Sequence, residues 1–256
     1  MPEINIYNYS YKYAAKPILN KIDLDINVNT SVAIVGLSGC GKSTLLKRIS
    51  GIEPKLGFES GNIQIDKMLP EQYLDTKQTS FMFQEPTLLP NLNVKENLEF
   101  PLNALNLPNN EISVNHYLDL IGLQDFKYFL PNKLSGGMKT RVALARSFIS
   151  KPKLLLLDEP FSSLDIGWQI DLYNKLNLLK AEISSTLILV THNIIEALYL
   201  CNTVYVLGKS GEFIQKIQIN QDLPRTYPLK ETAFRSKIEF DLIWQTLETD
   251  KFQYEK

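Results

Sequence analysis

The sequence predicts an α/β fold: a mostly parallel sheet covered by helices, joined by an antiparallel β subdomain and an inserted helical subdomain. Continuous apolar runs at 32–35, 154–157 and 187–190 are typical of central strands in such a sheet, because helices cover both of its faces. Alternating apolar and polar residues at 3–8 and 22–28 are typical of half-buried antiparallel strands. The chain has 256 residues, 44% of them hydrophobic, which is enough for one large core or a core with a subdomain.

The middle of the chain carries two further short strands and then changes character. Residues 60–66 and 80–83 have the length and composition of strands. From 86 to 150, prolines punctuate short helical stretches such as 111–122 and 138–150. We interpret 86–150 as a helical subdomain inserted between strands of one sheet.

The last part of the chain is predicted to pack on this core. A short hairpin with Gly211 follows Gly208, and the polar tail after it includes a helix near 230–249. We therefore divide the chain into one domain over 1–208 and a C-terminal hairpin and helical tail over 209–256.

A glycine-rich segment, Gly36–Thr44, reads GLSGCGKST and joins the strand at 32–35 to a helix that stops at Gly51. The spacing of its glycines, lysine and serine matches a phosphate-binding loop for nucleoside triphosphates. Glycines let the backbone curl so that N–H groups point at phosphate oxygens, and the helix adds its positive N-terminal end. Lys42 is predicted to reach the β- and γ-phosphates, and the Ser43 hydroxyl to bind Mg²⁺. The nucleotide-binding residues predicted from this loop are Gly36, Ser38, Gly39, Cys40, Gly41, Lys42, Ser43 and Thr44.

Two carboxylates follow the apolar run at 154–157, where the sequence reads LLLLDE. Ligands bind at the carboxyl ends of parallel strands, so Asp158 is predicted to hold Mg²⁺ through water. Glu159 stands beyond the strand end, where a carboxylate can act as general base on the water that attacks the γ-phosphate. The alternative is a salt-bridged acidic pair that caps the turn before Pro160.

His192 and Gln84 each follow a predicted strand, and the strand before His192 ends at the same edge of the sheet as Asp158. A histidine there can hydrogen-bond the γ-phosphate and hold the attacking water. A glutamine offers a carbonyl to Mg²⁺ and an NH₂ group to water or phosphate. From position alone, a structural histidine is as good an explanation of His192, and glutamines at strand ends are common.

A second anion site is predicted at Ser135, Gly136 and Gly137, which precede the helix at 138–150 in the segment LSGGMKTR. The first turn of a helix carries N–H groups without partners, and these groups bind anions. The alternative is that Ser135 only caps a structural helix.

Bulk composition narrows the function classes. The net charge is −1, without the basic excess that a nucleic-acid backbone attracts. Cys40 and Cys201 cannot form a disulfide framework, which fits a reducing cytosol. The start of the chain lacks the pattern of a signal peptide, and no apolar run approaches the ~20 residues that span a bilayer.

Together these segments resemble the nucleotide-binding subunit of an ABC transporter. GLSGCGKST resembles the Walker A loop, LLLLDE the Walker B strand and LSGGMKTR the ABC signature. Gln84 matches the Q-loop, SSLD at 162–165 the D-loop and His192 the switch histidine. All six occur in the family's order over about residues 3–208, and the resemblance implies a P-loop NTPase (RecA-like) core sheet.

The resemblance also implies a head-to-tail dimer in which each ATP lies between the Walker A loop of one subunit and the signature of the other. Lys42, Ser43, Gln84, Asp158, Glu159 and His192 would then act on the ATP of their own subunit. Ser135, Gly136 and Gly137 would contact the ATP of the other subunit, and Asp165 would lie across the interface. Family members stack adenine on an aromatic residue near the N-terminus, for which Tyr13 fits best and Tyr11 is the alternative.

A narrower resemblance points to bacterial importer ATPases of the nitrate/sulfonate/taurine group. It is carried by FQEPTLLPNLNVKENLEFPL, LSGGMKTRVALAR, LDEPFSSLD and THNIIEALYL. The chain departs from the usual pattern at Leu37 (often Pro), Thr140 (often Gln), Asn193 (often Asp) and Asn29-Thr30 (often Gly-Glu). None of these departures removes a catalytic group.

An importer subunit of this kind hydrolyses ATP with Mg²⁺ and powers uptake of a small solute through a separate transmembrane permease. We expect a second ATPase subunit, either an identical copy or a paralogue. We also expect a periplasmic or lipid-anchored solute-binding protein as an indirect partner, and a place at the cytoplasmic face of the inner membrane. A groove near Gln84–Asn97 is expected to grip a permease helix. Leu88, Leu89 and Leu92 would either line this groove or belong to the subdomain core.

Two other classes compete with this interpretation. A soluble ABC ATPase of the iron–sulfur assembly type fits the size of the chain, whereas the DNA-repair type needs long coiled-coil insertions that the sequence lacks. A small-molecule kinase accounts for the phosphate-binding loop but gives no reason for LSGG.

Overall fold

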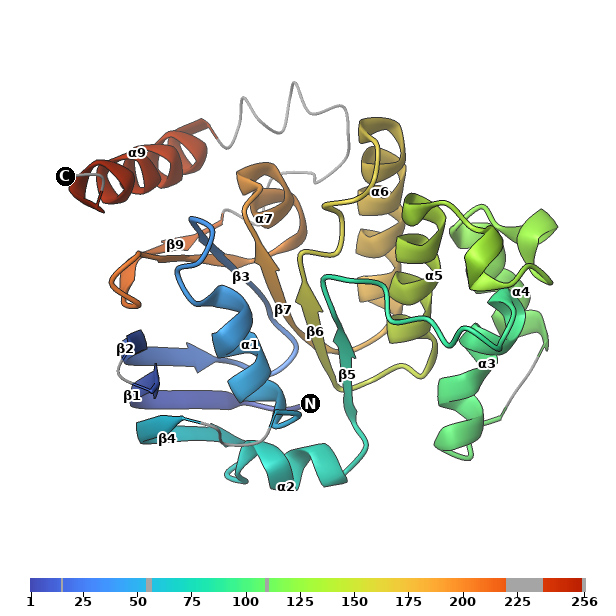
Figure 1. Ribbon diagram of the computed structural model, residues 1–256, viewed down its shortest axis with the longest axis horizontal. Coiled ribbons are helices and arrows are strands. Elements are labelled where there is room, and N and C mark those ends of the chain that lie inside the picture. Colours follow the sequence, from blue (N-terminus) through green and yellow to red (C-terminus); the bar gives the residue numbers. More distant parts are fainter. Residues whose placement is uncertain (15, 54–56, 109–110, 220–236, 255–256) are drawn as a thin grey trace.

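The computed structural model describes residues 1–14, 16–53, 57–108, 111–219 and 237–254, which form two sheets and the helices around them (Figure 1). The larger sheet has six strands in the order β5-β6-β7-β3-β8-β9. They are β3 (Ser31–Gly36), β5 (Thr79–Met82), β6 (Leu154–Asp158), β7 (Thr186–Thr191), β8 (Thr203–Leu207) and β9 (Phe213–Gln218). All neighbouring pairs run parallel except β8 and β9, which are antiparallel.

The central strands are buried on both faces, as their apolar runs predict. Successive side chains of a strand point to opposite faces of the sheet, so each run serves two cores. In β3, Ala33 and Val35 join one hydrophobic cluster, whereas Val32 and Ile34 join the other. The predicted α/β class is thereby confirmed in its main element.

The smaller sheet is antiparallel and has the order β2-β1-β4. Its strands are β1 (Ile4–Tyr13), β2 (Lys16–Ile26) and β4 (Phe58–Ile65), and β1 and β2 are longer than their alternating segments predict. The pairing of β1 and β2 contains register shifts near Asn8 and Lys21, both with positive φ. Such bulges break the two-residue period, which hides the full strand length from the sequence pattern.

Helix α1 (Lys42–Ser50) lies between the two sheets (Figure 1). Its buried residues, including Leu45 and Leu46, pack in the cluster that also takes side chains from both sheets. The helix ends at Gly51, whose φ of 70° is the left-handed conformation of a C-terminal cap.

Most of the remaining helices cover the other face of the large sheet and one end of it, whereas the short helix Pro70–Asp75 contacts α1 and β4. The segment predicted as helical contains α3 (Val94–Ala104), α4 (Glu111–Leu120), two 3₁₀ turns, η1 (Gln124–Phe126) and η2 (Pro131–Lys133), and α5 (Gly136–Ile149). These elements gather beyond β5 and β6 in Figure 1. The other helices are α2 (Pro70–Asp75), α6 (Ile166–Glu182) and α7 (Ile194–Leu200).

The C-terminal helix α9 (Lys237–Tyr254) lies against β8, β9 and α7. The predicted helix near 230–249 therefore continues to Tyr254, while its first part, 230–236, lies outside the described residues. None of the helices that the structure describes is long and apolar enough to cross a membrane.

Candidate nucleotide-binding site

The phosphate-binding loop runs from the end of β3 to the start of α1, as predicted. Gly39 and Gly41 have φ of 78° and 107°, which residues with a side chain rarely adopt. A Cβ on Gly36 would lie 2.4 Å from the Leu207 carbonyl oxygen, so this position has no room for a side chain. The loop is therefore shaped by its glycines and by the strand next to it.

Lys42 lies inside the loop. Its side chain is buried, and its ammonium donates hydrogen bonds to the carbonyl oxygens of Gly36 (2.9 Å) and Leu37 (3.1 Å). A buried ammonium needs such partners, because an unpaired charge out of water is costly. The loop backbone thus holds the positive charge at the position where the sequence predicts phosphate.

Ser43 of α1 and Asp158 of β6 are 115 residues apart in the chain and meet at this site. The Ser43 hydroxyl donates a hydrogen bond to Asp158 Oδ1 at 2.8 Å. Burial raises the pKa of Asp158, and repulsion from Glu159 adds to this effect, while the bond from Ser43 lowers it. A hydroxyl beside a carboxylate is an oxygen donor set that suits Mg²⁺, so these residues fit the predicted metal.

Two of the predicted catalytic side chains, those of Gln84 and His192, meet at one oxygen atom of a third, Glu159 Oε2. The Gln84 side-chain amide donates to it at 3.3 Å, and His192 Nδ1 lies 3.3 Å from it. Gln84, Glu159 and His192 follow the adjacent strands β5, β6 and β7, which explains why they meet. The backbone at Glu159 has a positive φ of 46°, and its N–H donates to the Val190 carbonyl at 2.9 Å, which fixes the carboxylate at the sheet edge.

A buried carboxylate that the sequence analysis missed lies behind His192. Glu196 accepts hydrogen bonds from the Thr191 hydroxyl, the Tyr173 hydroxyl (3.0 Å) and the Asn193 amide (3.3 Å). Burial raises the pKa of Glu196, while the bonds from Thr191 and Tyr173 act in the opposite direction. Because Thr191 and Asn193 flank His192, this network holds the turn that carries the histidine. The signal in the sequence was a glutamate four residues after the histidine, inside an otherwise apolar helix.

The predicted second anion site lies at the exposed N-terminus of α5. The Ser135 side chain accepts a hydrogen bond from the Met138 N–H at 3.2 Å and so caps the helix. A Cβ on Gly136 would meet no atom within 4 Å. The capping role proposed as the alternative is therefore present, and it leaves Gly136 on an open surface.

Thr140 ties this helix to the D-loop. Its hydroxyl donates to the Gly136 carbonyl at 3.1 Å and lies 2.6 Å from the Ser163 hydroxyl. Asp165, at the end of the D-loop, caps α6 by accepting a hydrogen bond from the Trp168 N–H at 3.1 Å. Thr140, which departs from the family pattern, thus joins the signature segment to the D-loop through the contact with Ser163.

The two tyrosines considered for stacking on adenine, Tyr13 and Tyr11, differ in their surroundings. Tyr13 is exposed at the end of β1, whereas Tyr11 is buried and lies under the Arg48 guanidinium, 5.4 Å from its ring centroid. Only the Tyr13 ring has a face available to a ligand. The hairpin that carries it reaches the phosphate-binding loop, since a Cβ on Gly41 would lie 2.9 Å from the Ile18 carbonyl oxygen.

The two cysteines are both buried, and burial raises the pKa of the Cys40 thiol. Cys40 therefore fills space under the loop, with its Sγ 2.8 Å from the position of a Cβ on Gly36.

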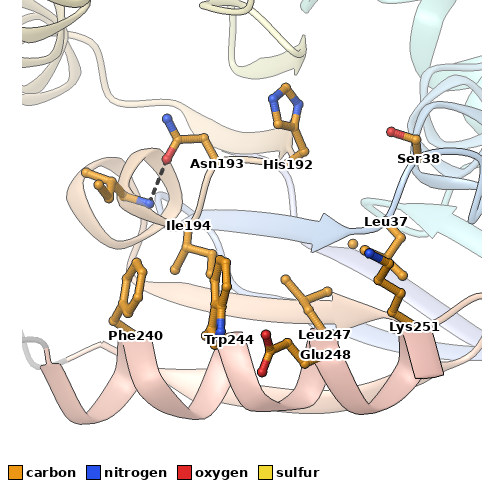
Figure 2. Close-up of a pocket in the computed structure, with 12 residues that line it drawn as sticks. Leu37, Ser38, His192, Asn193, Ile194, Phe240, Trp244, Leu247, Glu248 and Lys251 are labelled. Carbon is orange, nitrogen blue, oxygen red and sulfur yellow. Dashed lines mark hydrogen bonds between the residues drawn. The ribbon is translucent and has the colours of Figure 1, made fainter. Parts of the chain in front are cut away.

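Two hollows adjoin the site. One, of about 620 Å³, lies between α9 and the loop and is lined by Gly36, Leu37, Ser38, His192, Asn193, Ile194, Ile195, Phe240, Trp244, Leu247, Glu248 and Lys251 (Figure 2). The other, of about 180 Å³, is a groove between β5 and the helices α3 and α5, lined by residues that include Phe81, Phe83, Phe100, Pro101 and Arg146. Leu88 packs against the hydrophobic core, which is the second of the two possibilities given for it, and none of Leu88, Leu89 and Leu92 lines this groove.

The fold and the loop define a P-loop nucleoside triphosphatase. The LSGG segment at 134–137 narrows this class to ATPases of the ABC type. A model of the ABC transporter family matches residues 19–162, more than half of the chain. The chain belongs to the ABC transporter family and is an ATPase of the ABC type.

Curated relatives extend the match beyond this domain. The spermidine/putrescine import ATP-binding protein PotA of Thermotoga maritima is 38% identical over 216 residues, which are 83% of this chain but only 58% of PotA. The aliphatic sulfonates import ATP-binding protein SsuB 1 of Pseudomonas savastanoi pv. phaseolicola is 37% identical, over 88% of this chain and 90% of SsuB 1. A putative ATP-binding protein of Brucella abortus biovar 1 is 34% identical over 98% and 97% of the two chains.

A solved structure has the same fold. The dimeric post-hydrolysis structure of the ATP-binding cassette MJ0796 bound to ADP and Pi matches with a TM-score of 0.73 and 27% identity, over 85% of this chain and 99% of that one. The predicted fold, an ABC ATPase with an antiparallel β subdomain, is therefore confirmed.

Proposed function

We propose that this chain is the ATP-hydrolysing subunit of a bacterial importer, working as a dimer on a separate permease. The observation that carries the proposal is the convergence of Gln84 and His192 on Glu159 Oε2, beside the phosphate-binding loop. The names of the PotA and SsuB 1 relatives support import, and the likeness to SsuB 1 over most of both chains favours a small solute of the sulfonate kind.

Hydrolysis is assigned to the residues around Glu159. Its Oε2 takes a proton from a water molecule, the water oxygen bonds to the γ-phosphorus, and the bond from that phosphorus to the bridging oxygen of ADP breaks. His192 and Gln84 hold the water and the γ-phosphate in place. Lys42 exchanges its hydrogen bonds to the loop carbonyls for bonds to phosphate oxygens.

Ser43, Asp158 and Gln84 are the residues proposed to hold Mg²⁺. The metal supplies positive charge that neutralises the phosphates as charge shifts to the leaving group. Ser43 and Asp158 already lie in contact, so the chain provides two of these oxygen ligands from one place.

The dimer completes each site. Ser135, Gly136 and Gly137 of the second copy are proposed to bind the γ-phosphate, with Asp165 across the interface, and Tyr13 to stack on adenine. The exposure of Gly136 and of Tyr13 supports both roles. Dimeric structures of the ABC cassette MJ0796 support the assembly. Losing the γ-phosphate removes the bridge between the copies and lets the dimer reopen.

The 180 Å³ groove is the proposed docking place for a permease helix. Its aromatic walls come from both sides, Phe81 and Phe83 from the β5 segment and Phe100 from α3. The Arg146 guanidinium, which donates to the Thr87 carbonyl at 2.8 Å, joins the helical segment to the Gln84 segment. Motion of Gln84 with the nucleotide would therefore reach the groove.

This proposal keeps the division into an ABC domain over 1–208, with its helical subdomain at about 86–150, and a C-terminal part over 209–256. It also keeps the indirect solute-binding protein and the place at the cytoplasmic face of the inner membrane.

The test is the variant Glu159→Gln. It is expected to bind ATP, to accumulate as a dimer and to lose turnover by about 100-fold or more, because the general base is gone. Glu96→Gln is the matched control: a glutamine there can keep the hydrogen bond to the Asn93 N–H (2.8 Å) that closes the cap of α3. Near-normal ATPase activity of Glu159→Gln would refute the assignment, and co-purification of the wild-type chain with a membrane permease tests the importer role.

A further inference from the structure

The C-terminal helix α9 is held firmly at two points. Ile243 is fully buried in the main hydrophobic cluster. Near the other end, the buried Asp250 carboxylate accepts the Lys209 N–H at 3.0 Å and so binds the turn after β8. The position of α9 beside the phosphate-binding loop is therefore part of the fold.

Between these two points α9 does not close against the loop. The 620 Å³ cavity lies there, with Phe240, Trp244 and Leu247 on one wall and Leu37 and Ile194 on the facing wall (Figure 2). The rings of Phe240 and Trp244 are nearly parallel, with centroids 6.2 Å apart. Trp244 remains 50% exposed, so a large aromatic surface faces open space.

The polar rim of this cavity belongs to the nucleotide site. Ser38 and His192 both line it, and Asn193 adjoins them (Figure 2). In the proposed function, the same side of the loop and of His192 faces the second copy, because the γ-phosphate bridges the two copies there. The cavity therefore opens onto the proposed dimer face.

We propose that a second copy of this chain covers the cavity when the dimer closes, so that α9 is an added part of the dimer interface. The proposal rests on the dimer put forward above. The second copy is the occupant because the cavity is continuous with the proposed dimer face: a surface that contacts Ser38 and His192 also contacts the apolar wall next to them. The dimeric cassette MJ0796 matches 85% of this chain and 99% of its own, so the part of the fold that the two share is enough for a dimer.

An aromatic side chain that becomes buried in the centre of an interface is commonly worth a tenfold change in affinity or more. Trp244→Lys would place a charge in the covered cavity. It is expected to raise the dimer dissociation constant at least about tenfold, measured by sedimentation velocity with ATP in the Glu159→Gln background. Affinity of the monomer for ATP should not change, because Trp244 is not among the residues proposed to bind ATP.

Ile238→Lys is the matched control, since Ile238 is 82% exposed on the same helix and does not line the cavity. It should dimerise like the parent protein. Thermal unfolding without nucleotide checks that both variants are folded. As a second measurement, a photo-crosslinking amino acid in place of Trp244 should form a covalent dimer only when ATP is present.

The outcomes separate the two proposals. If the Glu159→Gln parent does not dimerise with ATP, the proposed dimer and the proposed interface both fail. If the parent dimerises and Trp244→Lys dimerises equally well, the interface alone fails. Crosslinking to a permease segment, or a small molecule retained on the monomer in native mass spectrometry, would also overturn it in favour of that occupant.

Discussion

Removing the Ser43 hydroxyl should weaken the fold in a way that depends on pH. In the protein without nucleotide or metal, this hydroxyl is a hydrogen-bond donor to the buried Asp158 carboxylate, at 2.8 Å. A hydrogen bond to a charged group contributes about 1.5–3 kcal/mol. Asp158 is only 2% exposed, so its carboxylate depends on protein donors such as Ser43 for its hydrogen bonds. Ser43→Ala should therefore lower the free energy of unfolding by about 1.5–3 kcal/mol at neutral pH.

The sign of the pH dependence follows from the pKa of Asp158. Burial already raises this pKa above the unfolded value of 3.8, so the ionised carboxylate costs stability. This cost grows as the pH rises from the unfolded value through the folded one. Without the Ser43 donor the folded pKa rises further, and the difference between variant and wild type should be larger at pH 7.5 than at pH 4.5.

Urea unfolding at the two pH values, with a metal chelator present, measures the effect. Ser147→Ala is the control: its buried hydroxyl donates to the neutral Leu144 carbonyl at 2.6 Å, so it should cost about 1 kcal/mol at most at either pH. In the Asp158→Asn background, the loss of stability caused by Ser43→Ala should be the same at both pH values. An equal loss of stability at pH 4.5 and 7.5 for Ser43→Ala would refute the reasoning.

The phosphate-binding loop offers two more predictions. Gly36→Ala should destabilise the fold by about 1–3 kcal/mol, because its Cβ would lie 2.4 Å from the Leu207 carbonyl oxygen. Gly136→Ala is the control: its Cβ would meet no atom within 4 Å, so its free energy of unfolding should stay within about 0.5 kcal/mol of wild type. A comparable loss of stability in both variants would show that the close approach to Leu207 is not the cause. Lys42→Ala should bind ATP about 10–100-fold more weakly in calorimetric titration, since charge-assisted bonds to phosphate are lost. Wild-type affinity there would contradict the loop assignment.

Elements whose pattern is local were predictable from the sequence. The strand before the phosphate-binding loop appears at Ser31–Gly36 because four apolar residues in a row suit a strand covered on both faces. Helix α1 ends at Gly51 because glycine accepts the left-handed conformation at no steric cost. Glu159 and His192 were placed on one sheet edge by the order of the strands, and Gln84 was placed at the end of another strand. The structure brings the three together; their catalytic roles remain predictions.

Features that depend on contacts distant in the sequence were not predictable. The apolar pattern at Leu88 fits a groove or a core equally well, and only the packing shows that it belongs to the core. Likewise no property of 237–254 by itself says that this helix lies beside Leu37 and Ser38. The Glu196 network was missed because a lone glutamate in a helix is usually solvated, and only burial reveals its hydrogen bonds.

The Asp250 carboxylate has a practical consequence for anyone who shortens this protein. A stop codon or a protease cut ahead of residue 250 would remove the acceptor of the Lys209 N–H, at a turn that directly follows Leu207. The Leu207 carbonyl is the group against which Gly36 packs. Loss of the C-terminal residues would therefore disturb a turn that lies close to the phosphate-binding loop. Nucleotide-binding experiments should use a chain that includes residue 250.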